Sequence, residues 1–117
     1  KSSQLGVAKA LIEEFGAVSA EVAKAMCEGA AKSSGATIGL STTGIAGPSG
    51  GTESKPVGTV FIGCTINGET QVRAFIFTGT RNEIRRRAAN SALQMVRLLL
   101  IGKEAESMCW QHRDIQL

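Results

Sequence analysis

The stretch from Thr42 to Val60 combines glycine, hydroxyl and cationic residues in a way that could bind an anionic ligand. Glycines reach positive φ angles and let backbone N–H groups approach a ligand, and hydroxyls can donate further hydrogen bonds. The P-loop pattern GxxxxGK[ST] and the pattern GxGxxG are both absent from the sequence. A plain surface connection stays open, although about thirteen structureless residues between core strands are unusual without a function. The candidate ligands here are Thr43, Gly44, Gly47, Ser49, Gly50, Gly51, Thr52 and Lys55.

A second chemical feature is the basic run TGTRNEIRRR at residues 78–87. Thr80 and Glu83 have the spacing of a capping box, which predicts that a helix begins here. Arg81 then lies at the positive end of the helix dipole, where a cation costs about 0.3–1 kcal/mol. A bound phosphate or carboxylate would turn this cost into a gain in stability, because guanidinium groups and helix N–H groups both favour anions. We therefore select Arg81 and Arg85, one turn apart, as candidate anion ligands; the alternative is a solvated basic face partly neutralised by Glu83.

Other catalytic and metal-binding chemistries find little support in the sequence. The one histidine, His112, lies near the end of the chain, which argues against a Ser-His-Asp triad. Carboxylates do not cluster and no cysteine pair has zinc spacing, so we expect no metal and no cofactor. A hydrolase would then need another base, and a lysine whose pKa is lowered by burial or by nearby cations is the natural candidate. We expect the three cysteines, Cys27, Cys64 and Cys109, to be reduced thiols of a cytoplasmic protein.

Length and composition indicate one globular domain, or part of one. The 117 residues are 43% hydrophobic, which is enough to build a core. No apolar run approaches the roughly 20 residues of a membrane helix, so we expect no membrane partner. A net charge of +3, one Trp and no Tyr argue against a nucleic-acid partner.

Hydrophobic periodicity predicts the helices and strands that surround the glycine-rich stretch. Ser19 fits an N-cap position, and Gly35 fits the residue that closes the same helix. Asn67-Gly68 predicts a tight hairpin, because both residues tolerate positive φ angles. The expected helices are 8–16, 20–33 and 80–102, the expected strands are 36–43, 57–66 and 69–78, and the apolar stripe of the last helix is Ile84, Ala88, Ala92, Met95 and Leu99.

The segment TTGIAGPSGGTESKPVGTVFIG at 42–63 resembles the signature loop of the CinA C-terminal domain family of competence/damage-inducible proteins. LGV at 5–7, GAVSAEVAKAM at 16–26 and FTGTRNEIRRRAANSAL at 77–93 fit the family pattern in the same order. The resemblance implies an α/β fold, a three-layer α/β/α sandwich with a mixed sheet. It covers a CinA C-terminal-like domain at 1–102 and leaves a tail at 103–117 without an assigned role.

The family includes nicotinamide-nucleotide amidohydrolases, so the resemblance also implies metal-independent amide hydrolysis by a Ser nucleophile, a Lys base and an Arg. Lys1 matches the family's lysine, because KSSQLGV places it ahead of the Leu-Gly-Val pattern. Arg81 matches the family's arginine, with Thr80 where an Asp is usual. The family's Glu-Ser-Cys-Thr-Gly-Gly motif, and the nucleophile expected in the first third of the domain, have no counterpart in these 117 residues.

The leading hypothesis is deamidation of nicotinamide mononucleotide to nicotinic acid mononucleotide and ammonia. The partner would then be a small nucleotide substrate, and the nucleophile would lie outside the sequence. One alternative is a non-catalytic nucleotide-binding or protein-interaction module of a competence/damage-inducible protein. Another is a regulatory domain that reads pyridine nucleotide without turnover. We also expect apolar surface where the first third of the domain would pack, and a homo-oligomer as a result.

Overall fold

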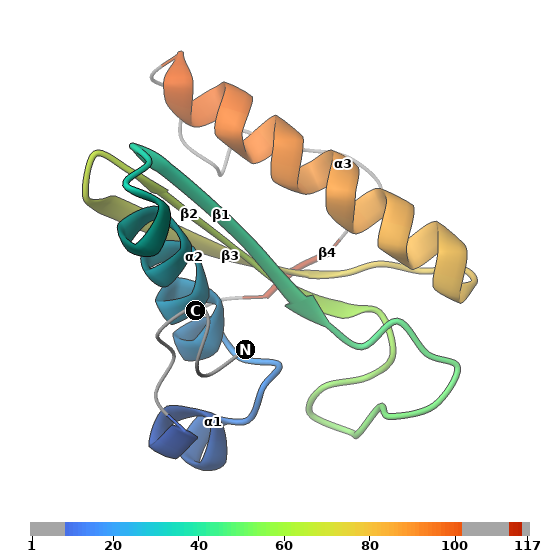
Figure 1. The fold of residues 1–117 in the computed structure, drawn as a ribbon. Helices are drawn as coiled ribbons and strands as arrows, with labels where there is room; N and C mark the ends of the chain where they lie inside the picture. Colours follow the sequence, from blue (N-terminus) through green and yellow to red (C-terminus); the bar gives the residue numbers. More distant parts are fainter. Residues whose placement is uncertain (1–8, 102–112, 116–117) are drawn as a thin grey trace.

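A four-stranded sheet lies between two helical layers (Figure 1). The computed structural model describes residues 9–101 and 113–115 of the chain. Helix α2 covers one face of the sheet with α1 packed beside it, and α3 covers the other face. The three-layer α/β/α arrangement predicted from the sequence is therefore confirmed. The elements in chain order are α1 (Lys9–Phe15), α2 (Ala20–Ser34), β1 (Ile38–Gly44), β2 (Thr59–Ile66), β3 (Glu69–Ile76), α3 (Arg81–Leu100) and β4 (Arg113–Ile115).

The strands follow the order β1-β2-β3-β4, and every pairing between the described strands is antiparallel. The described sheet therefore differs from the mixed sheet that was expected. The reason is that neither the connection from β1 to β2 nor the hairpin from β2 to β3 contains a helix that could carry the chain back across the sheet, so both pairs run antiparallel. The hairpin forms at Asn67 (φ 51°) and Gly68 (φ 84°), as predicted. Residues 113–115 of the expected tail extend the sheet by pairing with Ala74–Ile76.

Capping fixes the ends of α2 as the sequence predicts. The Ser19 hydroxyl accepts a hydrogen bond from the Val22 N–H at 3.2 Å, and Gly35 closes the helix with a φ of 70°. The hydroxyl of Ser19 also donates to the Gly16 carbonyl at 2.8 Å, which fixes the connection from α1 to α2. This connection contacts the glycine-rich loop.

Strands β1 and β2 differ in burial. All of β2 from Thr59 to Thr65 is buried, as its continuous apolar sequence predicts, because helices cover both of its faces. In β1, by contrast, Thr42 and Gly44 are exposed while Ser41 and Thr43 are buried. The mostly apolar sequence at 36–43 favours a buried strand, but β1 is only partly buried, because it is the edge of the described sheet.

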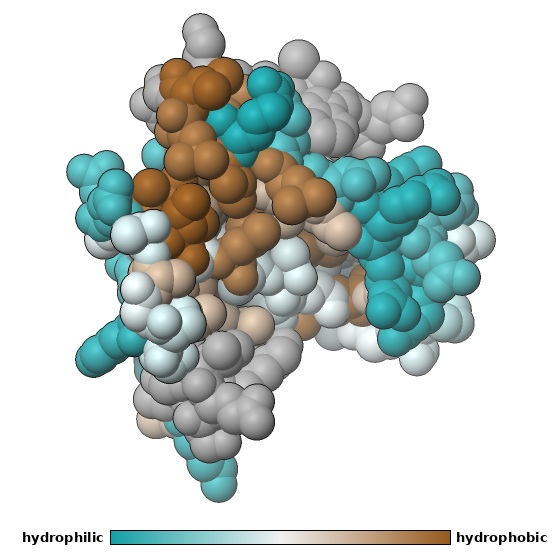
Figure 2. Space-filling model, turned by 45° about the horizontal axis from the view of Figure 1, so that its top comes forward, coloured by the Kyte–Doolittle hydropathy of each residue, from teal (hydrophilic) through white to brown (hydrophobic). Residues whose placement is uncertain are grey.

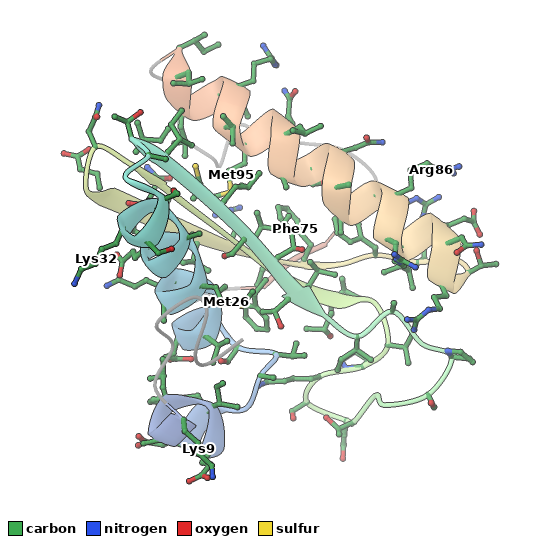
Figure 3. All side chains as sticks on the ribbon, viewed as in Figure 1. Lys9, Met26, Lys32, Phe75, Arg86 and Met95 are labelled. Carbon is green, nitrogen blue, oxygen red and sulfur yellow. The ribbon has the colours of Figure 1, made fainter. Side chains whose placement is uncertain are left out.

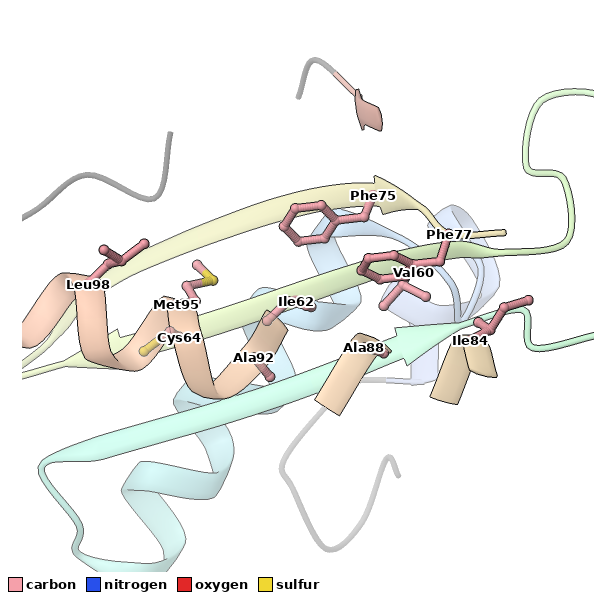
Figure 4. Close-up of a cluster of buried hydrophobic side chains, with 10 residues drawn as sticks. All are labelled: Val60, Ile62, Cys64, Phe75, Phe77, Ile84, Ala88, Ala92, Met95 and Leu98. Carbon is pink, nitrogen blue, oxygen red and sulfur yellow. The ribbon is translucent and has the colours of Figure 1, made fainter. Parts of the chain in front are cut away.

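The main core lies between α3 and the sheet (Figure 4). Phe75 and Met95 are fully buried and lie in the space between these layers, whereas Lys32 and Arg86 point outward (Figure 3). A smaller cluster of Ala23, Phe61 and Ala74 packs α2 against the face of the sheet that lies opposite to α3. The predicted apolar stripe of α3 is buried at Ile84, Ala88, Ala92 and Met95. Its last predicted member, Leu99, is only half-buried, and Leu98 is buried in its place.

Leu98→Ala is expected to lower the free energy of unfolding by about 2–3 kcal/mol, because the side chain is 7% exposed and packs in the main core. Leu100→Ala, in the same turn but with Leu100 59% exposed, should cost about 0.5 kcal/mol or less. Urea unfolding of both variants gives the two values. Equal losses would contradict the described packing of the last turn.

Candidate functional site

The first turn of α3 is held by the predicted capping box. The Thr80 hydroxyl accepts from the Glu83 N–H at 3.2 Å, and the Thr80 N–H donates to the Glu83 carboxylate at 2.9 Å. The hydrogen bond from the Thr80 backbone, more than any other contact, lowers the pKa of Glu83. The carboxylate therefore stays ionised at the positive end of the helix, where it offsets part of the basic charge that follows.

Arg81 connects this turn to the glycine-rich loop. Its Nη1 donates to the carbonyl oxygen of Gly47 at 2.9 Å. The sequence does not predict this contact, because nothing in the spacing of Gly47 and Arg81 indicates that they lie close together. A guanidinium carries five N–H donors, so one bond to the loop leaves capacity for an anion. Arg81 can therefore position the loop and contribute charge at the same time.

The loop between β1 and β2 is also braced from within. At its base, the Ile45 N–H donates to the Thr59 carbonyl at 2.9 Å and the Gly58 N–H donates to the Ile45 carbonyl at 2.7 Å. Near its tip, the Lys55 N–H donates to the Thr52 hydroxyl at 3.0 Å. Gly47 has a φ of 79°, and a Cβ there would lie 2.5 Å from Cγ1 of Val57. Packing of the loop on itself therefore accounts for this glycine without a ligand.

A groove of about 490 Å³ opens between β1 and α3, at the end of the sheet where the loop begins. Three predicted ligands, Thr43, Gly44 and Arg85, line it together. The other predicted ligands, which are Gly47, Ser49, Gly50, Gly51, Thr52, Lys55 and Arg81, are not among its lining residues. The groove thus has a basic, polar end near the loop.

The remaining wall of the groove is apolar and comes largely from residues of α3 that were not among the predicted ligands. Ala88, Ala89, Ala92 and Leu93 lie along it, and Leu93 is 65% exposed. Figure 2 shows apolar residues gathered in one area of this face, next to a hydrophilic area. In the sequence, the alanines that follow the arginines indicate such a groove wall, because small side chains leave room beside a helix.

Lys55 and Thr43 contact the connection between α1 and α2. The Lys55 ammonium donates to the carbonyls of Val18 at 2.5 Å and Phe15 at 3.4 Å, and lies 5.9 Å from the centroid of the Phe61 ring. The Thr43 hydroxyl donates to the Ala17 carbonyl at 2.7 Å. The described contacts of Lys55 are therefore structural, and its role as a substrate ligand stays a prediction.

Lys55→Met is expected to lower the free energy of unfolding by about 1–2 kcal/mol, because it leaves the Val18 carbonyl without its donor while keeping an apolar stem over the Phe61 ring. Lys24→Met, on the exposed face of α2, is the matched control and should change stability by about 0.5 kcal/mol or less. Thermal unfolding compares the two. A loss no larger than that of the control would show that the Lys55 contacts contribute nothing to stability.

Neither the Ser41 hydroxyl nor the Cys27 thiol has the surroundings of an activated nucleophile. The Ser41 hydroxyl is buried and donates to the Ala23 carbonyl at 2.6 Å, so it serves packing. Burial raises the pKa of the Cys27 thiol to about 11, so this thiol is protonated at neutral pH. Lys1, the expected base, and the tail residues Cys109 and His112 lie outside the described residues.

Two absences hold for residues 9–101 and 113–115. No group of three or more His, Cys, Asp or Glu side chains is arranged to hold a metal ion in this part of the chain. The helices within the same residues are too short or too polar to cross a membrane.

Comparisons with known proteins place this fold in one family. The model of the CinA C-terminal domain matches residues 1–100. A CinA-like protein of Kosmotoga olearia is 54% identical over 101 residues, which are 86% of this chain and 24% of that protein. The solved competence/damage-inducible protein CihA of Agrobacterium tumefaciens is 37% identical with a TM-score of 0.81, over 85% of this chain and 61% of its own. A CinA superfamily protein of Escherichia coli is 31% identical, also with a TM-score of 0.81, over 85% of this chain and 58% of its own.

The chain thus spans about a quarter of the length of the Kosmotoga relative and about three fifths of the solved structures. The match covers the glycine-rich loop, both arginines that were selected and the groove between β1 and α3. Since the family model matches far more than half of the residues, the chain belongs to the CinA C-terminal domain family of competence/damage-inducible proteins.

Proposed function

We propose that the protein carrying this chain is a nicotinamide-nucleotide amidohydrolase, which converts nicotinamide mononucleotide and water to nicotinic acid mononucleotide and ammonia. The observation that most supports this is the groove that Arg85 lines together with the end of β1 at Thr43 and Gly44. The chain spans about a quarter of the curated relative described above, so the activity is proposed for the whole protein.

The basic end of the groove suits the phosphate of a nucleotide. Arg85 lies in the groove wall, and Arg81 lies one turn earlier in α3, bound to the loop at Gly47. A phosphate placed there would offset the unfavourable accumulation of positive charge at the N-terminal end of α3. Guanidinium groups also bind phosphate through paired hydrogen bonds. The volume of about 490 Å³ is within the range of small-molecule sites.

The proposed reaction is acyl transfer from the carboxamide. A serine outside these 117 residues attacks the amide carbon and Lys1 takes its proton; Lys1 then gives this proton to the amide nitrogen as the C–N bond breaks, which releases ammonia. Water then hydrolyses the acyl-enzyme to the acid. Arg81 and N–H groups of the loop would stabilise the negative charge that develops on the carbonyl oxygen.

The phosphate assignment is tested by comparing nicotinamide mononucleotide with nicotinamide riboside, which lacks the phosphate, as substrates of the full-length protein. We expect kcat/KM to favour the nucleotide by about 100-fold or more, and Arg85→Ala to remove most of that preference. An unchanged preference in the variant would contradict the role of Arg85. Binding of the nucleotide with no release of ammonia would instead favour the non-catalytic nucleotide-binding module.

A further inference from the structure

The connection between α1 and α2 presents backbone carbonyl groups to the loop between β1 and β2. The Lys55 ammonium donates to the carbonyls of Val18 at 2.5 Å and of Phe15 at 3.4 Å. The connection itself is fixed, because Gly16 turns the chain with a φ of 83° and its carbonyl accepts from the Ser19 hydroxyl at 2.8 Å. Lys55 therefore attaches the loop to a firmly held segment that is distant in sequence.

The charge of Lys55 is met by carbonyl oxygens and an aromatic ring instead of a carboxylate. The ammonium lies 5.9 Å from the centroid of the Phe61 ring. Among the residues that the structure describes, the ion pair of Lys9 and Glu13 is the one salt bridge, so no carboxylate there binds Lys55. Carbonyl groups and an aromatic face direct an ammonium group without neutralising it. The side chain is thus oriented by the protein while its positive charge stays beside the loop.

Lys55 also fixes the tip of the loop, which we define as residues 49–52. The Lys55 N–H donates to the Thr52 hydroxyl at 3.0 Å, and the Thr52 N–H donates to the Lys55 carbonyl at 2.8 Å. These two bonds close a small turn, so the position of Thr52 follows that of Lys55. On the other side of the tip, the carbonyl of Gly47 is bound by Arg81. The loop is thus anchored from α3 through Arg81 and at the α1–α2 connection through Lys55.

The tip between these two anchors has backbone donors to offer. The N–H groups of Ser49, Gly50 and Gly51 donate no hydrogen bond to any residue in the described part of the chain, and all three residues are exposed. Successive free N–H groups suit an anion, such as a phosphate or the oxyanion of the proposed reaction. Such donors stabilise a transition state only when they are held in the right place.

We propose that Lys55 is a positioning residue, which holds the tip of the loop so that the free N–H groups of Ser49, Gly50 and Gly51 stabilise the charge that develops on the substrate. The proposal rests on the amidohydrolase function proposed above. It gives Lys55 a role through the loop instead of a contact with the substrate. A ligand of the phosphate acts on the binding of the nucleotide, whereas a residue that positions transition-state donors acts on kcat.

The kinetics of Lys55→Met in the full-length protein separate these two roles. We expect kcat for nicotinamide mononucleotide to fall by about 30-fold while KM changes by less than about threefold, because the loop donors act mainly in the transition state. The preference for the nucleotide over nicotinamide riboside should stay within about threefold of the wild-type value. A wild-type kcat in the variant would overturn the proposal. Loss of the preference would overturn it as well, because Lys55 would then be a ligand of the phosphate.

Two further variants separate positioning from a general loss of stability. Lys55→Arg keeps N–H donors that can reach the two carbonyls, so it should restore kcat to within about fivefold of the wild-type value. Leu98→Ala, in the main core, is expected to lose at least as much stability as Lys55→Met but to keep kcat within about threefold. Equal losses of kcat in Leu98→Ala and Lys55→Met, or no recovery in Lys55→Arg, would contradict the positioning role.

Amide hydrogen exchange gives a readout that does not depend on turnover. We expect the Thr52 amide to exchange about 10-fold faster in Lys55→Met than in the wild-type protein, while the Gly58 amide at the base of the loop changes by less than about threefold. Unchanged exchange at Thr52 would overturn the positioning role even where ammonia is released. Absence of ammonia with the wild-type protein would instead refute the proposed function, and exchange at Thr52 would still decide whether Lys55 holds the loop.

Discussion

Replacement of Arg81 by alanine is expected to lower kcat/KM for nicotinamide mononucleotide by about 100-fold or more in the full-length protein. The variant loses the cation proposed to stabilise the negative charge on the carbonyl oxygen, and such groups typically contribute two to three powers of ten. It also loses the hydrogen bond from Nη1 to the Gly47 carbonyl, so the loop is held less firmly. Both losses act on the proposed site, and the rate of ammonia release measures them together.

The same substitution should leave stability nearly unchanged. The lost hydrogen bond costs about 0.5–1.5 kcal/mol, whereas removal of a cation from the positive end of α3 returns about 0.3–1 kcal/mol. We therefore expect a net change below about 1 kcal/mol in urea unfolding. Arg86→Ala, at an exposed position of the same helix, is the matched control and should alter neither activity nor stability appreciably. A large loss of stability in Arg81→Ala, or equal activity losses in both variants, would count against the proposed role.

The second large effect is expected at Gly39. A Cβ at this position of β1 would lie 2.0 Å from the backbone oxygen of Cys27 in α2 and 3.0 Å from Cβ of Ala31. The atom at 2.0 Å is backbone, so the helix itself would have to move away from the sheet. We expect Gly39→Ala to lower the free energy of unfolding by about 3 kcal/mol or more, measured by urea unfolding.

Gly35→Ala separates this clash from ordinary backbone strain. Gly35 ends α2 with a φ of 70°, and a Cβ there meets nothing within 4 Å. The expected cost is therefore only the strain of a left-handed residue, about 1–2 kcal/mol. If Gly39→Ala costs no more than Gly35→Ala, α2 does not pack against β1 as closely as described.

The sequence predicts most of the fold because its local signals are strong. The capping box at Thr80 and Glu83, the N-cap Ser19 and the hairpin at Asn67-Gly68 all form as expected. Each of these depends on residues close together in the chain, so spacing alone identifies it. The partial burial of β1 could not be predicted, because an apolar sequence pattern does not distinguish a strand at the edge of a sheet from one in the middle.

The site could be predicted only in part. Thr43, Gly44 and Arg85 do meet in one groove, but the bond from Arg81 to Gly47 and the anchoring of Lys55 on Val18 join residues far apart in sequence. Nothing in composition or periodicity reports such contacts. A charged residue in a glycine-rich loop resembles a ligand whether its side chain faces the ligand or the protein, which is why Lys55 could not be placed in advance.

The most direct test of the proposed function is the stoichiometry of the reaction with nicotinamide mononucleotide. The full-length protein would be incubated with the nucleotide, and ammonia and nicotinic acid mononucleotide would be quantified in the same samples. We expect the two products in equal amounts, with the rate reduced by about 100-fold or more in Arg81→Ala. Nucleotide that binds but yields neither product in the wild-type protein would contradict the amidohydrolase function.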